Sequence, residues 1–214
     1  MLKNTLEYFT PEDKEDDDTE NHILARIQSQ EPVDTVDDKD FTLEEISSAI
    51  ESMGNKKAQG EDEITGETYK SSFESFPNYI TAMYNECLIR VFPERWKRAK
   101  LIPNTKPGIE NNEYVSKFRP ILLNTGGKVL EKVTINRINH HIYSHHLMNT
   151  NQYGVTPRRS TIDAAMAVKD YVEEGLVAGE LILLISLDVK CAFDVAWWSS
   201  ILIGLEACGC PKNL

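Results

Sequence analysis

The chain has 214 residues, of which 41% are hydrophobic and 27% are charged, and its formal net charge is −11. This is an ordinary globular composition, and a chain of this length can bury a sizeable core without disulfides or metals. The four cysteines are too few and too scattered for a disulfide framework. The longest apolar run is far too short for a membrane span, and the N-terminal residues lack the apolar stretch of a signal peptide. These features exclude secreted and membrane-spanning proteins and predict an intracellular one.

Charge is distributed unevenly along the chain. Residues 1–51 hold 16 acidic and 4 basic residues, whereas residues 90–159 hold 13 basic and 4 acidic residues, a local net charge of +9. A basic block of this size in an acidic chain is expected of a surface that binds a phosphate-bearing partner. A solvated surface rich in Lys and Arg is the alternative, and charge alone does not separate the two.

The first 40 residues combine low hydrophobicity with many like charges, which predicts a disordered acidic linker or arm. The folded domain is expected to cover residues 41–214. Capping-box patterns at Thr42 and Ser160 mark the starts of two helices. Apolar spacing and turn residues predict, in chain order, a helix over 42–53, a loop over 55–65, a helix from Pro77, a short strand within 97–108, a strand over 119–123, a long helix over 125–148, a loop over 149–159, and helices over 160–176 and 192–207.

Residues 181–187 form a continuous apolar run that predicts a strand buried on both faces. Asp188 follows this run directly, at the kind of strand end where α/β sheets present functional groups. A carboxylate there can bind Mg²⁺, whereas the alternative is a helix cap. Arg119 begins the earlier apolar strand and can clamp a polyphosphate, whereas the alternative is an ordinary ion pair with Glu110 or Glu113.

Four histidines form the pattern HHIYSHH over residues 140–146, and His141 and His145 have the spacing of a zinc pair. No acidic or cysteine residue stands at a supporting spacing, so this pattern is interpreted as an ordinary helix face. The sequence contains no Walker-type glycine loop, no GxGxxG and no GxSxG, so it offers no support for P-loop, dinucleotide-binding or serine-hydrolase chemistry.

Six segments carry a specific order of motifs: FTLEEISSAI (41–50), NKKAQGEDEIT (55–65), FPERWKRAKLIPNTKPG (92–108), FRPILLNTGGKVLEK (118–132), NQYGVTPRRSTIDAA (151–165) and SLDVKCAFDVAWW (186–198). Together they resemble the reverse transcriptase of non-LTR (LINE-type) retrotransposons, and most closely the type-1 retrotransposable element polyproteins of arthropods. The resemblance covers residues 41–214, and six motifs in order are far more specific than any one of them.

The resemblance implies the right-hand fold of a polymerase, with fingers and the beginning of the palm in this chain. The fold class expected is therefore α/β (α+β), helix-rich, with an incomplete palm sheet. Asp188 is then expected to bind both catalytic Mg²⁺ ions, with the backbone carbonyl of Val189 contributing. Phe193 corresponds to the steric gate that favours deoxynucleotides, and Arg119 and Lys106 to fingers residues that hold the triphosphate.

By the same resemblance, the loop that contains Arg158, Arg159 and Ser160 approaches the backbones of template and primer. The implied partners are an RNA template, a DNA primer and deoxynucleoside triphosphates, with Mg²⁺ as cofactor and no membrane. The implied location is the nucleus and the cytoplasm. The implied chemistry is two-metal nucleotidyl transfer, in which the metals stabilise the attacking and leaving oxygens.

The sequence departs from the family pattern at several positions. Where KKAPGPDGI is usual, Gln59 and Glu61 replace two prolines and Glu63 replaces a glycine. Val155 stands where phenylalanine is usual, and Cys191 stands where glycine is usual. Such scattered changes are typical of a decaying copy.

The resemblance also predicts a limit on activity. The 214 residues contain no Tyr/Phe-x-Asp-Asp motif, which carries the other two catalytic carboxylates in the family, and no thumb or endonuclease is recognised. The chain is therefore expected to be a fragment that does not polymerise by itself. The alternatives are a non-catalytic nucleic-acid-binding remnant and an inert pseudogene product.

Overall fold

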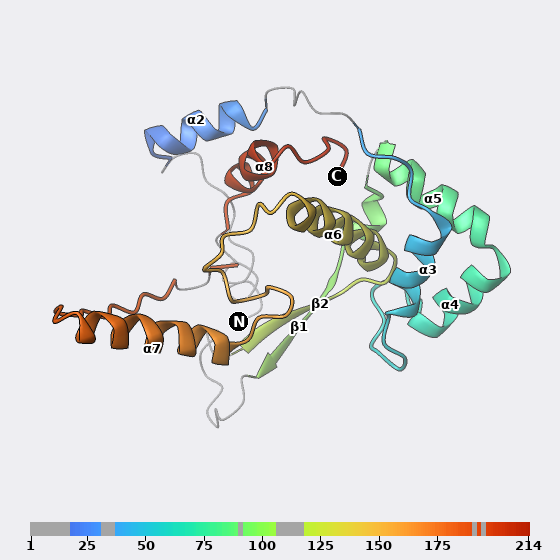
Figure 1. Cartoon of the computed structure of the whole chain (residues 1–214). Coiled ribbons are helices and arrows are strands. Elements are labelled where there is room, and N and C mark those ends of the chain that lie inside the picture. The colour runs from blue at the N-terminus through green and yellow to red at the C-terminus, as the bar shows by residue number, and fades with distance from the viewer. Residues whose placement is uncertain (1–17, 31–36, 90–91, 106–117, 190–191, 194–195) are drawn as a thin grey trace. The chain divides into compact units, whose positions relative to one another are not determined.

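A computed structural model of the protein describes residues 18–30, 37–89, 92–105, 118–189, 192–193 and 196–214 (Figure 1). The chain divides into two compact units, one of residues 1–141 with 194–214 and one of residues 142–193. The first unit holds α2 (Glu20–Gln28), α3 (Leu43–Glu51), α4 (Gly66–Ser75), α5 (Pro77–Ile89), the 3₁₀ turn η2 (Glu94–Trp96), β1 (Lys100–Thr105), β2 (Phe118–Leu123), most of α6 (Gly126–Ser144) and α8 (Trp198–Ala207). The second unit holds the end of α6 and α7 (Thr161–Val177).

Both capping boxes predicted from the sequence are present. At the start of α3 the backbone N–H of Glu45 donates to Thr42 Oγ1 at 3.2 Å, and Thr42 N–H donates to Glu45 Oε2 at 2.8 Å. At the start of α7 the N–H of Asp163 donates to Ser160 Oγ at 3.2 Å, and Ser160 N–H donates to Asp163 Oδ2 at 2.7 Å. Each pair satisfies two backbone donors that a helix start leaves without partners.

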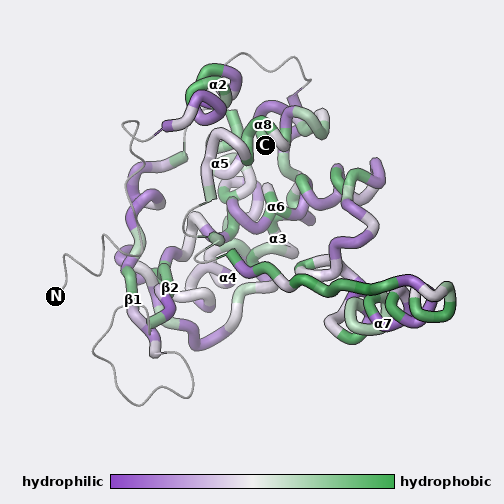
Figure 2. The backbone as a smooth tube through the Cα atoms, turned by 90° about the vertical axis from the view of Figure 1, so that its left-hand side faces the viewer, coloured by the Kyte–Doolittle hydropathy of each residue, from purple (hydrophilic) through white to green (hydrophobic). Residues whose placement is uncertain are grey.

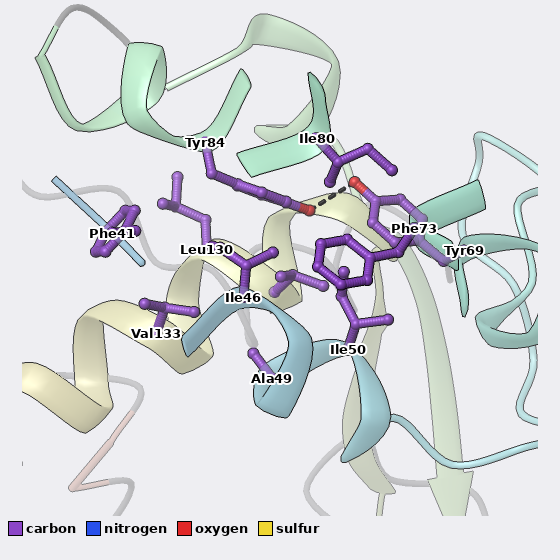
Figure 3. Packing of buried hydrophobic residues seen from close by; sticks show 11 residues of the cluster. Phe41, Ile46, Ala49, Ile50, Tyr69, Phe73, Ile80, Tyr84, Leu130 and Val133 are labelled. Atoms are coloured by element: carbon purple, nitrogen blue, oxygen red, sulfur yellow. Dashed lines mark hydrogen bonds between the residues drawn. The ribbon is translucent and has the colours of Figure 1, made fainter. Parts of the chain in front are cut away.

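The core of the first unit lies where α3, α4, α5 and α6 meet (Figure 3). Two tyrosines form its polar centre, because the hydroxyls of Tyr69 and Tyr84 lie 2.5 Å apart and Tyr84 also donates to the carbonyl of Gly126 at 3.1 Å. The largest fully buried side chains around this pair are Tyr84, Ile46, Ile50, Val129 and Val133. These residues lie between Ile46 and Val133, far apart in the sequence, so the core joins the helices into one unit.

The two predicted strands are confirmed and pair as an antiparallel hairpin, with Lys100 opposite Leu123 and Thr105 opposite Phe118. Pro103 lies directly opposite Pro120. Because proline has no N–H, this pair fits a position that exchanges no hydrogen bond across the ladder. At such a position the backbone N–H would point away from the partner strand, and proline has none. Each outer edge of the hairpin therefore has one hydrogen-bond donor fewer for pairing with a further strand.

Two helices were not anticipated from the sequence. Residues 20–28, inside the segment expected to be disordered, form α2, which begins with Thr19 accepting from the N–H of His22 at 3.3 Å. Its Arg26 lies over the ring of Trp197, 5.2 Å from the centroid, and α2 contacts α8. Residues 66–75 form α4, whose apolar stripe is short because Tyr69 and Phe73 are its only large buried side chains. Helix α2 has no buried residue and is stabilised by its cap and by the Arg26–Asp18 pair, whereas α4 depends on the burial of Tyr69 and Phe73.

The second unit corrects two predictions. Residues 181–187 do not form a strand: the segment is irregular, and Leu181 and Leu187 are 98% and 89% exposed. A buried strand needs sheet neighbours, and the described residues of this unit contain no other strand. The segment instead folds back along α7 (Figure 2). The side chain of Ile182 packs against Gly175 of that helix. The apolar face expected to point inward on α7 is also largely exposed, with Tyr171 at 70% and Leu176 at 60%.

The predicted start of the last helix is also too early, because α8 begins at Trp198 and not at residue 192. Its end is as predicted. Gly209 adopts φ +65°, and the N–H of Cys210 donates to the carbonyl of Leu205 at 3.0 Å. This is the glycine-ended helix terminus expected from the sequence.

The loop predicted over residues 55–65 is confirmed, and it contains a strained position. Glu63 has φ +57°, a left-handed conformation that favours glycine, and glycine is the residue expected there from the family resemblance. We expect Glu63→Gly to raise the free energy of unfolding by about 1 kcal/mol, measured by urea denaturation. Glu61→Gly is the matched control, because Glu61 has an ordinary φ, and it should lower stability by about 0.5–1 kcal/mol. Equal losses for both variants would contradict the assignment of strain to position 63.

Candidate nucleic-acid interface

The connection between β2 and α6 joins three of the motif-bearing segments, and we call it the motif junction. Asn124 caps α6 by accepting from the N–H of Gly127 at 2.9 Å, and its amide donates to the carbonyl of Trp96 at 2.5 Å. The hydroxyl of Thr125 donates to the carbonyl of Ile64 at 2.8 Å. The polar residues of FRPILLNTGGK therefore hold the 55–65 and 92–108 segments in place, which is a structural role.

Gly126 is part of the motif junction because the indole of Trp96 packs directly against its backbone. A Cβ at this position would lie 2.6 Å from the ring of Trp96, so only glycine leaves room for the indole. The same ring lies 5.5 Å from that of Tyr84, which is fully buried in the core. Trp96 therefore packs the start of the basic segment against the core. The exposed Lys97, Arg98 and Lys100 follow this anchored residue in the sequence.

Arg119 is exposed near the start of β2, opposite Asn104 of β1. Residues directly opposite in an antiparallel pair share a face, and alternate residues repeat it, so Lys100 lies on the same face of the hairpin as Arg119. Within the described part of the chain no ion pair involves Arg119, which leaves its guanidinium available to an anion. Lys106, Glu110 and Glu113 lie outside the described residues.

The three residues predicted to contact nucleic acid in the 149–160 loop have different roles. Ser160 is the N-cap of α7, so its hydroxyl is committed to Asp163. Arg159 donates to the carbonyls of Thr150 and Gln152, the latter at 3.3 Å, and lies over the ring of Tyr153. Arg159 therefore organises the loop.

Arg158 is exposed, as Arg159 is, and has φ +61°. It lines a surface cavity of about 510 Å³ together with Arg159, with Tyr143 near the end of α6 and with His146 in the turn that follows. No hydrogen bond or ion pair to another described residue engages its side chain. Of the three predicted contact residues, Arg158 is therefore the one whose side chain is not engaged by another described residue.

One cation of the basic block serves the fold and was missed by sequence reasoning. Arg137 on α6 donates to both carboxylate oxygens of Glu45, at 2.8 and 2.7 Å, and to Asp38 Oδ2 at 3.1 Å. It also donates to the carbonyls of Lys39 and Asp40, and lies 4.6 Å from the ring centroid of Phe41. By composition, Arg137 is one of the 13 basic residues of the 90–159 block. Its contacts show that Glu45 and Asp38 neutralise its charge within the fold.

The Arg137 guanidinium, through its hydrogen bonds, lowers the pKa of the Glu45 carboxyl below its ordinary value. Glu45 in turn raises the pKa of Arg137. A second contact reinforces the strap of residues 37–41, because Asp38 N–H donates to Asn213 Oδ1 at 2.7 Å and Asn213 Nδ2 donates back to the carbonyl of Asp38 at 3.1 Å. The strap and the C-terminal residues of the first unit are thus held together.

Asp188, Val189 and Phe193 lie in the second unit, and all three are exposed, Phe193 at 91%. Among the described residues no group of three or more His, Cys, Asp or Glu side chains is placed to hold a metal ion. Magnesium is usually held by one or two carboxylates, with water and substrate phosphates as its other ligands, and a two-metal centre needs carboxylates in addition to Asp188. The described residues therefore do not fit a complete two-metal centre.

The histidine pattern is explained without a metal. His141 Nε2 lies 2.8 Å from the carbonyl of Cys208, within the first unit, and links α6 to the end of α8. His140, His145 and His146 are exposed. The interpretation as a helix face is correct for His140 and His141, whereas His145 and His146 lie in the turn after α6, which ends at Ser144 and not at residue 148.

No helix among the described residues combines the length and the hydrophobicity that a membrane crossing requires.

The comparisons with known proteins agree with the motif order. The family model described as reverse transcriptase (RNA-dependent DNA polymerase) matches residues 103–214, from within β1 through α8. The chain is 29% identical over 169 residues to the Retrovirus-related Pol polyprotein from type-1 retrotransposable element R1 of Bradysia coprophila, covering 78% of this chain and 16% of that protein.

Two Drosophila melanogaster proteins are similar at comparable levels. The probable RNA-directed DNA polymerase from transposon BS is 26% identical over 201 residues, covering 85% of this chain and 22% of that protein. The RNA-directed DNA polymerase from mobile element jockey is 27% identical over 185 residues, covering 86% and 20%. The chain spans no more than about a fifth of the length of these relatives. It belongs to the reverse transcriptase (RNA-dependent DNA polymerase) family, as a segment related to the polymerases of non-LTR retrotransposons.

Proposed function

We propose that this chain is a nucleic-acid-binding segment of an RNA-directed DNA polymerase, made of the fingers and the beginning of the palm. The observation that carries the proposal is the family match over residues 103–214, which contains the exposed Arg119 and Arg158. Exposed cations on a rigid base supply the electrostatic attraction that a nucleic-acid backbone requires. The partners proposed are an RNA template, a DNA primer and deoxynucleoside triphosphates.

Within that function, Asp188 is proposed as one carboxylate ligand of a catalytic magnesium site, with the carbonyl of Val189 beside it. When bound, Mg²⁺ would neutralise phosphate charge and stabilise the attacking and leaving oxygens. Further carboxylates would come from residues other than those described in this chain, and water and phosphate oxygens would complete the coordination. Phe193 is proposed as the steric gate against a ribose 2′-hydroxyl, which its large exposed ring supports.

Arg119 and Lys106 are proposed to hold the triphosphate of the incoming nucleotide. A guanidinium binds phosphate oxygens through two parallel hydrogen bonds, and Arg119 is exposed on the hairpin for such a contact. Lys106 follows β1 directly in the sequence, next to the strand that pairs with Arg119.

The proposal is tested by binding of the 214-residue chain to a fluorescent RNA–DNA primer–template at several salt concentrations. We expect Arg158→Gln to weaken binding at least about threefold and to reduce the slope of log affinity against log salt by about 1. Lys169→Gln is the matched control, because Lys169 lies on α7 and already pairs with Glu173 at 3.4 Å, and it should leave both quantities unchanged. Absence of salt-dependent binding by the unaltered chain would refute the proposed function.

A non-catalytic nucleic-acid-binding remnant is the second candidate, favoured by the lack of a metal-holding group among the described residues. The two candidates differ in their response to nucleotide and metal. The polymerase segment predicts that a deoxynucleoside triphosphate with Mg²⁺ tightens primer–template binding, and that Asp188→Asn and Arg119→Gln abolish this effect. The remnant predicts binding that is indifferent to Mg²⁺ and to Asp188.

A further inference from the structure

Two adjoining surface cavities in the first unit lie between the 55–65 loop and the start of the basic segment. One cavity, of about 190 Å³, is lined by Glu61, Asp62, Arg95 and Arg98. The other, of about 430 Å³, is lined mainly by residues 59–63 on one side and Lys100 on the other. Glu61 lines both cavities, so its carboxylate borders the space that all three cations face.

The cations around these cavities are not neutralised by direct pairing. Among the described residues no ion pair within 4.0 Å engages Arg95, Arg98 or Lys100. Lys97, in contrast, pairs with Glu94 at 2.5 Å. The three cations are exposed and flank Trp96, which the motif junction fixes to the core: Arg95 precedes it, and Arg98 and Lys100 follow it. They form a basic cluster open to an anionic partner.

The two carboxylates in the first cavity have different roles. Asp62 Oδ1 accepts from the N–H of Ile64 at 3.2 Å and so holds the turn. Glu61 is exposed, no hydrogen bond to another described residue engages it, and it stands where proline is usual in the resembling family. Its charge is therefore not required by the turn, and it lowers the positive potential of the cluster at short range.

We propose that Arg95, Arg98 and Lys100 bind phosphates of a nucleic-acid strand and that Glu61 opposes this binding as an intramolecular negative charge. The proposal rests on the proposed function, because it assumes that nucleic acid is the partner. It adds Arg95 and Arg98 to the proposed phosphate-binding residues, next to Lys100 on the hairpin face that also carries Arg119, and it adds a residue that sets the strength of binding. Glu61 and a phosphate compete for the same three cations, so removing the carboxylate strengthens binding.

The test measures binding of the full chain to single-stranded RNA at 50 mM salt and above. Glu61→Gln is expected to tighten binding about threefold at 50 mM salt and to have a smaller effect at higher salt, because it removes a negative charge near the cations that bind phosphate. Glu74→Gln on α4 makes the same change of net charge outside the loop and is expected to have no effect. In the Arg95→Gln/Arg98→Gln background, which should itself bind more weakly, Glu61→Gln should lose most of its effect.

Equal affinities of Glu61→Gln and the unaltered chain would overturn the proposal, as would a full gain that persists without the two arginines. Weaker binding by Glu61→Gln would also overturn it, since the carboxylate would then contact the ligand favourably. If the unaltered chain does not bind RNA, the proposed function fails. The competition by Glu61 is then tested with inorganic polyphosphate. Glu61→Gln must bind it more tightly than the unaltered chain, and Arg95→Gln/Arg98→Gln must bind it more weakly. Thermal unfolding of each variant confirms that the fold is kept.

Discussion

Replacing Arg137 by methionine is expected to lower the free energy of unfolding of the first unit by about 3 kcal/mol, measured by urea denaturation followed through tryptophan fluorescence. The side chain of Arg137 is only 12% exposed and contacts two carboxylates. Its removal leaves Glu45 and Asp38 without their cation and the carbonyls of Lys39 and Asp40 without a donor. Breaking such a pair from one side costs more than the pair itself contributes.

Lys132→Met is the matched control, because Lys132 is exposed on the same helix and belongs to the same basic block. Its effect should stay within about 0.5 kcal/mol. A loss below 1 kcal/mol for Arg137→Met would contradict the structural role assigned to this residue. Arg137→Lys tests the geometry, since an ammonium cannot reproduce the two-pronged contact with Glu45 and should recover only part of the loss.

The same contact predicts a pH dependence. The pKa of Glu45 is lowered in the folded state by the Arg137 hydrogen bonds, so its carboxylate form favours folding. This contribution is fully present above the ordinary glutamate pKa of 4.5 and is lost as the pH falls through the lowered folded value. The stability difference between the unaltered chain and Arg137→Met should therefore shrink as the pH falls through that window. A difference that is constant from pH 7 to pH 3 would count against the Glu45 contact.

Tyr84→Ala is expected to cost about 3–5 kcal/mol, because Tyr84 is fully buried and its ring fills the space between the core helices and Trp96. Tyr84→Phe keeps the ring and removes the hydroxyl, which leaves the carbonyl of Gly126 without this donor and Tyr69 without its partner. The phenylalanine variant should lose about 1–2 kcal/mol. Urea denaturation separates the two contributions, and equal losses would show that the ring adds nothing.

Burial raises the pKa of both Tyr84 and Tyr69 above the ordinary value of 10.0. The neutral hydroxyls are favoured in the folded state, so this contribution is complete below pH 10 and decreases as the pH rises above it. Tyr84→Phe should reduce the loss of stability on moving from pH 9 to pH 11. An unchanged alkaline loss would indicate that other groups control it.

The local elements of this chain were largely predictable. Thr42 with Glu45, and Ser160 with Asp163, are pairs whose partners lie three residues apart, so the sequence contains the whole interaction. The two strands were predicted for the same reason, from short apolar runs beside turn residues. Helix α4 was missed because its burial depends on Tyr69 and Phe73 meeting α3 and α5, and not on a long apolar stripe.

The functional roles of the candidate site residues stay predictions. Asp188, Arg119 and Arg158 were identified by motif, and their exposure agrees with contact to a partner. Ser160 and Arg159 carry the same motif but are engaged by the loop itself, and a motif does not separate a contact residue from a positioning residue. Similarly, nothing in the sequence distinguishes Arg137 from the exposed cations around it.

The amino-acid sequence alone determined the family, the helix starts and the presence of a basic segment, because motif order, caps and charge are properties of neighbouring residues. Tertiary structure decided which cations are free, where the motifs meet, and whether residues 181–187 form a strand. Those outcomes depend on partners far along the chain, such as Glu45 for Arg137, or on sheet neighbours for an apolar run. Only packing shows whether such partners are in reach.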